Sequence, residues 1–251
     1  MLNLFTNEIR LQFFLLKRYW FETVASSVLL IGLFLGLYFI ISAMNDGTSD
    51  ASDLETLIIG FVIWVFANAS YSSASKDIVE EIRQNTLERL SLSPSPLWMI
   101  FLLRAIWNII SGLAFLIFAL TALSYITNIQ LQIDWTVFLP SLLLGMPSLI
   151  GLGFVIAGFS VLFKKAQSIQ GVIYFVLIGV ISVTALPLNP ASILPFATAA
   201  TTAKSSISGG LLDLNTVIFI SLNSILYFFL GLIIFKKLLN KSRHEGVLGH
   251  Y

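Results

Sequence analysis

Long apolar runs separated by short polar stretches make up most of this chain. A helix needs about 20 predominantly apolar residues to cross the hydrocarbon core of a bilayer. Segments that meet this criterion are Val24–Met44, Leu54–Ser75, Leu97–Ile126, Val137–Phe163, Ile169–Leu186 and Leu214–Phe235. The pattern therefore predicts an all-α integral membrane protein with six transmembrane helices, built as one transmembrane domain over residues 1–251.

Two further segments are apolar without being suited to a full crossing. Before the first span, polar and apolar residues separate onto opposite faces of one helix, which predicts an amphipathic helix at residues 1–22 that lies in the membrane interface. After the fifth span, prolines and small residues interrupt the pattern between 187 and 210. Short half-helices that dip back from the outer face fit this stretch best, covered by protein rather than lipid.

The loop charges predict the orientation. Positively charged residues are concentrated in cytoplasmic loops of membrane proteins. With the N-terminus inside, every lysine and arginine except Lys204 falls in or beside an inner segment. Asp46, Asp50, Asp53 and Glu55 then cluster outside. We therefore expect a multi-pass protein with both termini in the cytoplasm.

One polar stretch differs from the other loops because it is strongly charged. This charged island covers residues 76–93, between the second and third spans, and carries Lys76, Asp77, Glu80, Glu81, Arg83, Glu88 and Arg89. Placing these charges at the bilayer centre would cost on the order of 20 kcal/mol, at roughly 3 kcal/mol each. The island therefore lies in water. Its helical spacing of apolar residues predicts a short cytoplasmic helix joined to two spans.

Composition narrows the possible functions. The chain is 57% hydrophobic and 11% charged, against about 25% charged in soluble domains, so no separate soluble domain is expected. A net charge of +1 without a long basic run gives no sign of nucleic-acid binding. Cysteine is absent, and the spans hold no cluster of metal ligands, no histidine beside a serine and no paired carboxylates. We expect neither an enzyme nor a metal site.

Transport would need an external energy source. The span interiors contain almost no ionisable residues, which proton- or sodium-coupled carriers commonly use. The chain also lacks the G-x-x-x-x-G-K-[ST] motif of a phosphate-binding loop. If the protein moves a solute uphill, we expect another polypeptide to supply the energy.

The island carries a family resemblance. The run from Ile78 to Pro94, Ile-Val-Glu-Glu-Ile-Arg-Gln-Asn-Thr-Leu-Glu-Arg-Leu-Ser-Leu-Ser-Pro, resembles the intracellular coupling segment of type-2 ABC exporter permeases. That family typically shows charged residues, then Gly-Thr-Leu-Glu, a hydrophobic pair and Ser-Pro. Asn85 stands where glycine is usual, and asparagine also tolerates unusual backbone angles. The interfacial helix, the six spans and the proline-rich outer segment agree with the same family.

The resemblance implies a permease of the bacterial inner membrane that pairs with a second permease copy, identical or paralogous, and with two separate ATP-binding subunits. ATP and Mg²⁺ would bind those subunits, and this chain would bind no cofactor. The residues implied to contact the ATPase are Glu80, Glu81, Arg83, Thr86, Leu87, Glu88 and Arg89. The family's transport path runs mainly along spans two and five. The corresponding candidates here are Phe61, Trp64, Asn68 and Tyr71, close to one helix face, with Tyr174, Phe175 and Ile178.

The expected cargo follows from the weakly charged path. It favours an amphipathic or hydrophobic substrate, such as a drug, a lipid-like product or a lipid-linked glycan. Export of a lipid-linked polysaccharide is an alternative within transport. A membrane anchor or sensor for a soluble protein, with no transport, is the alternative from another class.

Overall fold

The computed structural model describes residues 2–44, 51–84, 86–92, 96–163 and 167–244. These residues form helices α1 (Leu2–Arg18), α2 (Trp20–Met44), α3 (Ala51–Arg83), α4 (Leu87–Ser91), α5 (Leu97–Thr127), α6 (Trp135–Phe163), α7 (Gln167–Ser182), α8 (Ala197–Ser205) and α9 (Leu214–His244), with a short 3-10 helix, η1 (Pro190–Ile193), before α8. The all-helical class is confirmed for the described chain.

Within the described residues, five helices are long and apolar enough to cross a membrane: α2, α3, α5, α6 and α9. The protein is therefore a multi-pass membrane protein. The remaining predicted crossing, Ile169–Leu186, corresponds to α7, which has 16 residues and ends at Ser182. The six-span layout stays a prediction, because α7 is shorter than the other five helices.

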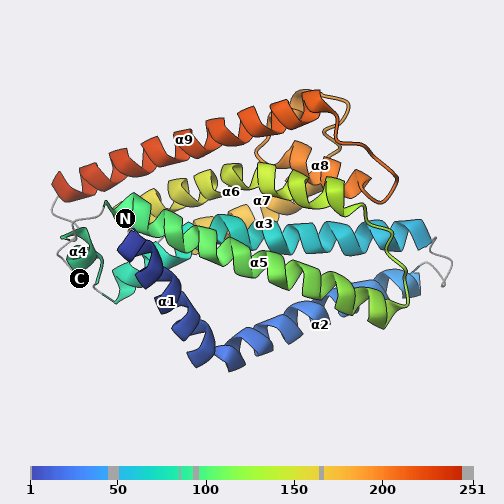
Figure 1. Ribbon diagram of the computed structural model, residues 1–251, viewed down its shortest axis with the longest axis horizontal. Coiled ribbons are helices and arrows are strands. Elements are labelled where there is room, and N and C mark those ends of the chain that lie inside the picture. The colour runs from blue at the N-terminus through green and yellow to red at the C-terminus, as the bar shows by residue number, and fades with distance from the viewer. Residues whose placement is uncertain (1, 45–50, 85, 93–95, 164–166, 245–251) are drawn as a thin grey trace.

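The long helices run along the longest axis of the molecule (Figure 1). Helix α6 lies at the centre and packs against α9, α3 and α8, while α3 also packs against α5 and α7. The C-terminal ends of α3 and α9 lie at the same end of the bundle as α4, which we call the island end (Figure 1). Helix α8 lies toward the opposite end.

Helix α2 is the least covered of the long helices. Phe34 is buried against Phe61 of α3, with ring centroids 5.0 Å apart, but residues 20–26 are all exposed. The predicted interfacial segment 1–22 ends earlier than expected, since α1 stops at Arg18 and α2 begins at Trp20. The two helices meet at a sharp bend, so α1 crosses the bundle obliquely near the island end (Figure 1).

The segment between α7 and α9 folds back into the protein. Residues 197–203 of α8 are all buried, so the rest of the protein covers this helix. Lys204 of α8 donates from Nζ to the carbonyl oxygen of Ile181 at 2.6 Å, so it caps the C-terminal end of α7. Asn223 and Tyr227 of α9 both donate to the carbonyl oxygen of Ile193 in η1. Residues 187–210, where we expected short half-helices at the outer face, contain η1 and α8; their place at the outer face stays a prediction.

Outside the predicted spans, Asp134 fixes the start of α6. The backbone nitrogen and the hydroxyl of Thr136 donate to its Oδ1 at 2.9 and 2.6 Å. These hydrogen bonds lower the pKa of the Asp134 carboxyl below its ordinary value. The negative charge at this position also favours the first turn of the helix.

Glycines allow α6 and α9 to touch along their backbones. A Cβ atom on Gly231 of α9 would overlap the backbone carbonyl of Gly151 in α6, and one on Gly151 would overlap the backbone carbonyl of Tyr227. Because these neighbours are backbone atoms, no side-chain rotation can relieve the overlap. Close approach through small residues is a usual packing mode for membrane helices.

Replacing Gly231 with alanine should therefore lower the thermal unfolding midpoint of the purified protein in detergent, at a cost of about 1–3 kcal/mol. Gly179→Ala on α7 is the matched control, because a Cβ there meets nothing within 4 Å. An equal shift in the two variants would contradict the predicted helix contact.

Candidate functional site

The charged island is divided between two elements rather than forming one helix. The separate helix predicted over residues 76–93 is wrong in its extent: α3 continues without a break through Arg83, and the short α4 begins at Leu87. A charged side chain is compatible with a helix, so the charges that begin at Lys76 do not mark the end of α3. The bend between the two helices, which we call the α3–α4 corner, is closed by Thr86, whose backbone nitrogen donates to the Glu81 carbonyl oxygen at 2.9 Å.

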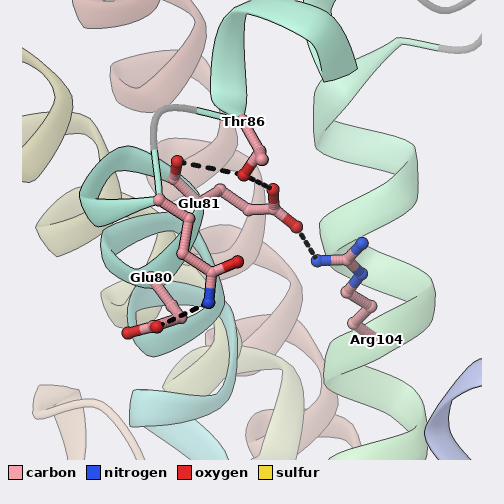
Figure 2. Close-up of polar contacts among 5 residues, drawn as sticks. Glu80, Glu81, Thr86 and Arg104 are labelled. Atoms are coloured by element: carbon pink, nitrogen blue, oxygen red, sulfur yellow. Dashed lines mark hydrogen bonds and ion pairs between the residues drawn. The ribbon is translucent and has the colours of Figure 1, made fainter.

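Glu81 is the central residue of this corner (Figure 2). Its Oε1 accepts a hydrogen bond from Nη1 of Arg104 in α5 at 2.7 Å, and its Oε2 accepts from the Thr86 hydroxyl. The Glu81 and Arg104 side chains are only 17% and 10% exposed. Arg104 also lies over the ring of Phe101, with 5.6 Å from its guanidinium carbon to the ring centroid. The pair joins the end of α3 to the first turns of α5.

Because this ion pair is mostly buried, forming it has a free-energy cost that its other contacts must offset. Removing two charges from water is costly, and the cost is offset only when the geometry is good and further hydrogen bonds satisfy the charged groups. Both carboxylate oxygens of Glu81 have such a donor. Beside it, Ile78, Ile82 and Leu87 are buried in the main apolar core. The inner side of the corner is therefore fixed to the bundle.

The outer side of the corner carries exposed charges. Arg83 and Glu80 form an exposed pair at 3.7 Å, and Gln84 donates from Nε2 to Glu80 Oε1 at 2.7 Å. Arg89 on α4 is also exposed. Surface pairs of this kind contribute at most about 1 kcal/mol. Their charges are available to a molecule outside the bundle.

The residues implied to contact an ATPase therefore fall into two groups, one exposed and one directed into the bundle. Glu80, Arg83 and Arg89 are exposed, whereas Glu81 and Thr86 bond to each other and Leu87 is buried. Glu88 lies in α4, and its side chain is outside the described residues. Sequence reasoning missed Arg104 as the bonding residue of Glu81, although a lone arginine near the start of an apolar span needs a nearby negative charge.

A second feature is a cavity of about 430 Å³ between α2, α3 and α7. Trp64, Asn68, Tyr71 and Tyr174, four of the candidate path residues, line it. The Trp64 and Tyr174 rings meet edge to face, with centroids 4.5 Å apart. Asn68 donates from Nδ2 to the carbonyl oxygen of Trp64 at 2.8 Å. The structure therefore brings aromatic and polar groups from two predicted spans to one wall.

The other three path candidates lie outside this cavity. Phe61 packs between Phe34 and Trp64. Phe175 and Ile178 are 70% and 44% exposed on the surface of α7. The cavity includes Lys76 and Gln170, which sequence reasoning did not assign to it. Lys76 lies eight residues, about two helical turns, beyond the path candidate Asn68, and this spacing was the available signal.

Two hydrogen bonds from α3 side chains hold α7 in place beside the cavity. Trp64 Nε1 donates to the Tyr174 carbonyl oxygen at 3.2 Å, and the Tyr71 hydroxyl donates to the Gln170 carbonyl oxygen at 2.9 Å. These bonds join residues that are 110 and 99 positions apart in the chain. The two bonds therefore connect the α3 and α7 walls of the cavity.

No known protein family matches this chain, and no curated protein is significantly similar to it. The fold and the apolar helices define the class, a multi-pass α-helical membrane protein.

Replacing Arg104 with methionine should destabilise the protein by about 3 kcal/mol, because it removes the cation that faces the mostly buried Glu81 carboxylate. Arg83→Met, which breaks the exposed pair with Glu80, should cost less than about 1 kcal/mol. Denaturant unfolding in detergent measures both. Equal losses in the two variants would exclude a special role for the buried pair.

Tyr71→Phe should loosen α7, because it removes the hydroxyl that donates to the Gln170 carbonyl. Hydrogen–deuterium exchange should rise in the peptides covering residues 170–174, with a stability loss of about 1 kcal/mol. Tyr125→Phe is the control, since Tyr125 is 86% exposed. Unchanged exchange in the Tyr71 variant would show that this bond does not hold α7.

Proposed function

We propose that this chain is the membrane-spanning subunit of an ATP-binding cassette exporter, which moves an amphipathic or hydrophobic substrate. A separate subunit hydrolyses the ATP. The observation that carries the proposal is that the α3–α4 corner has exposed charges on its outer side and a buried ion pair on its inner side. Exposed charges on Glu80, Arg83 and Arg89 face outward, and directly beneath them the Glu81–Arg104 pair links α3 to α5. A subunit docked on the exposed charges would move both helices together.

The six-span layout is part of this proposal. Helix α7 has 16 residues, which at 1.5 Å per residue extend about 24 Å, short of the roughly 30 Å hydrocarbon core. The buried helix α8 supports the idea that η1 and α8 occupy the missing depth beside α6 and α9. With six crossings, both termini lie on the island side, which the loop charges make cytoplasmic. The proposed location is the bacterial inner membrane.

The proposed assembly contains two copies of the permease, identical or paralogous, and two ATP-binding subunits. Phe175 and Ile178 on α7 are exposed, and in this assembly they face the second copy or lipid. The cavity between α2, α3 and α7 favours transport over a passive membrane anchor, because an anchor has no need of a ligand-sized space lined by polar and aromatic groups.

The test is ATP hydrolysis by the assembled complex. The full chain is purified from its native membrane, and nucleotide hydrolysis by the co-purifying ATPase is measured in lipid. Reversing two exposed charges, Arg83→Glu with Arg89→Glu, should reduce both co-purification and hydrolysis about tenfold, since like charges across an interface are repelled.

Lys237→Glu, also exposed and on α9 near the island end, is the matched control and should leave both quantities unchanged. Failure to recover any ATPase would overturn the proposal. Full hydrolysis by the Arg83/Arg89 double variant would overturn the role assigned to the corner.

A further inference from the structure

The cavity between α2, α3 and α7 has a polarity gradient along α3. Toward the middle of the bundle it is lined by Leu30, Trp64, Val65, Asn68 and Ala69, and toward the island end by Tyr71, Ser72, Lys76 and Gln170. The distance along α3 from Trp64 to Lys76 is about 18 Å at 1.5 Å per residue. The end toward the middle is therefore mostly apolar, with Asn68 as its polar side chain, and the island end is more polar and holds the charged Lys76.

Charge is restricted to the polar end. Among the described residues that line the cavity, Lys76 alone carries a formal charge, which is positive. Lys76 is also exposed, so a ligand can reach it from outside the bundle. A cation at this end attracts an anionic group and repels a cationic one.

The cavity volume limits the size of the occupant. About 430 Å³ is at the lower end of the range for small-molecule sites. It suits one compact or single-chain apolar body and is small for a two-chain phospholipid. The exposed residues 20–26 of α2 leave the island end of that helix uncovered by the bundle, which permits entry from the membrane on that side.

We propose that this cavity binds a single-chain anionic amphiphile. Its apolar body lies against Trp64 and Tyr174, and its anionic head lies at Lys76. The proposal rests on the proposed function in one respect: it names the substrate class of the exporter. Lys76 acts as a specificity-determining residue, since it distinguishes an anionic head from a neutral or cationic head on the same chain.

Trp64 is a built-in reporter for this site, because bromine atoms on a bound ligand quench indole fluorescence at contact. The full chain is placed in nanodiscs of phosphatidylcholine and titrated with three probes that share one dibrominated dodecyl chain: a sulfate, an alcohol and a trimethylammonium. The quenching lost in the Trp64→Phe variant is the part that reports on the cavity.

We expect the sulfate to saturate the Trp64-dependent quenching at a concentration about threefold to fivefold lower than the alcohol or the trimethylammonium. Lys76→Glu should abolish this preference, and Lys76→Arg should retain it. Lys237→Glu, an equal charge change outside the cavity, should also retain it. Thermal unfolding midpoints establish that each variant is folded.

Three outcomes would overturn the site. They are equal quenching by all three probes, an unchanged preference in Lys76→Glu, and quenching by brominated phosphatidylglycerol that equals quenching by the sulfate at the same mole fraction. The last would indicate a general anionic-lipid contact. The experiment needs no ATPase, so its failure leaves the exporter assignment standing. If it succeeds and no ATPase is recovered with the chain, the site is retained and the exporter assignment fails.

Discussion

The buried ion pair between Glu81 and Arg104 is the constraint on which the island end of this protein depends. It joins the charged end of α3 to α5, in addition to the apolar packing between the two helices. The Glu81 carboxylate fixes three features at once: the end of α3, the turn at Thr86 and the first turns of α5. Because donors from Thr86 and Arg104 hold both carboxylate oxygens, we expect the corner and the start of α5 to move together.

Helix α3 connects this corner to the cavity. Lys76 in the cavity lining lies only five residues before Glu81, and the same helix holds α7 in place through Trp64 and Tyr71. A displacement of the corner therefore reaches the cavity wall through one continuous helix. In the proposed exporter, this is how ATP hydrolysis in another subunit would change the affinity of the cavity for its substrate, provided that the two states differ in their contacts.

Sequence patterns identified most of the crossings because a span is encoded locally, by a run of apolar residues such as Leu97–Ile126. They failed where a partner is distant in the chain. Glu81 and Arg104 are 23 positions apart, and the charge of Glu81 alone gave no indication that it would face inward. On α7, Tyr174 lines the cavity while Phe175 is exposed, since consecutive helical residues point about 100° apart. The alignment of α7 beside α3 decides which of them reaches the site.

A double-mutant cycle on the ion pair tests the central claim most directly. Unfolding free energies are measured in detergent for Glu81→Gln, Arg104→Met and the double variant. Because the two side chains contact each other in a mostly buried setting, the losses should be non-additive, with a coupling energy of about 2 kcal/mol or more. Additive losses, within about 0.5 kcal/mol, would contradict the account, since the corner would then be held to α5 by something other than this pair.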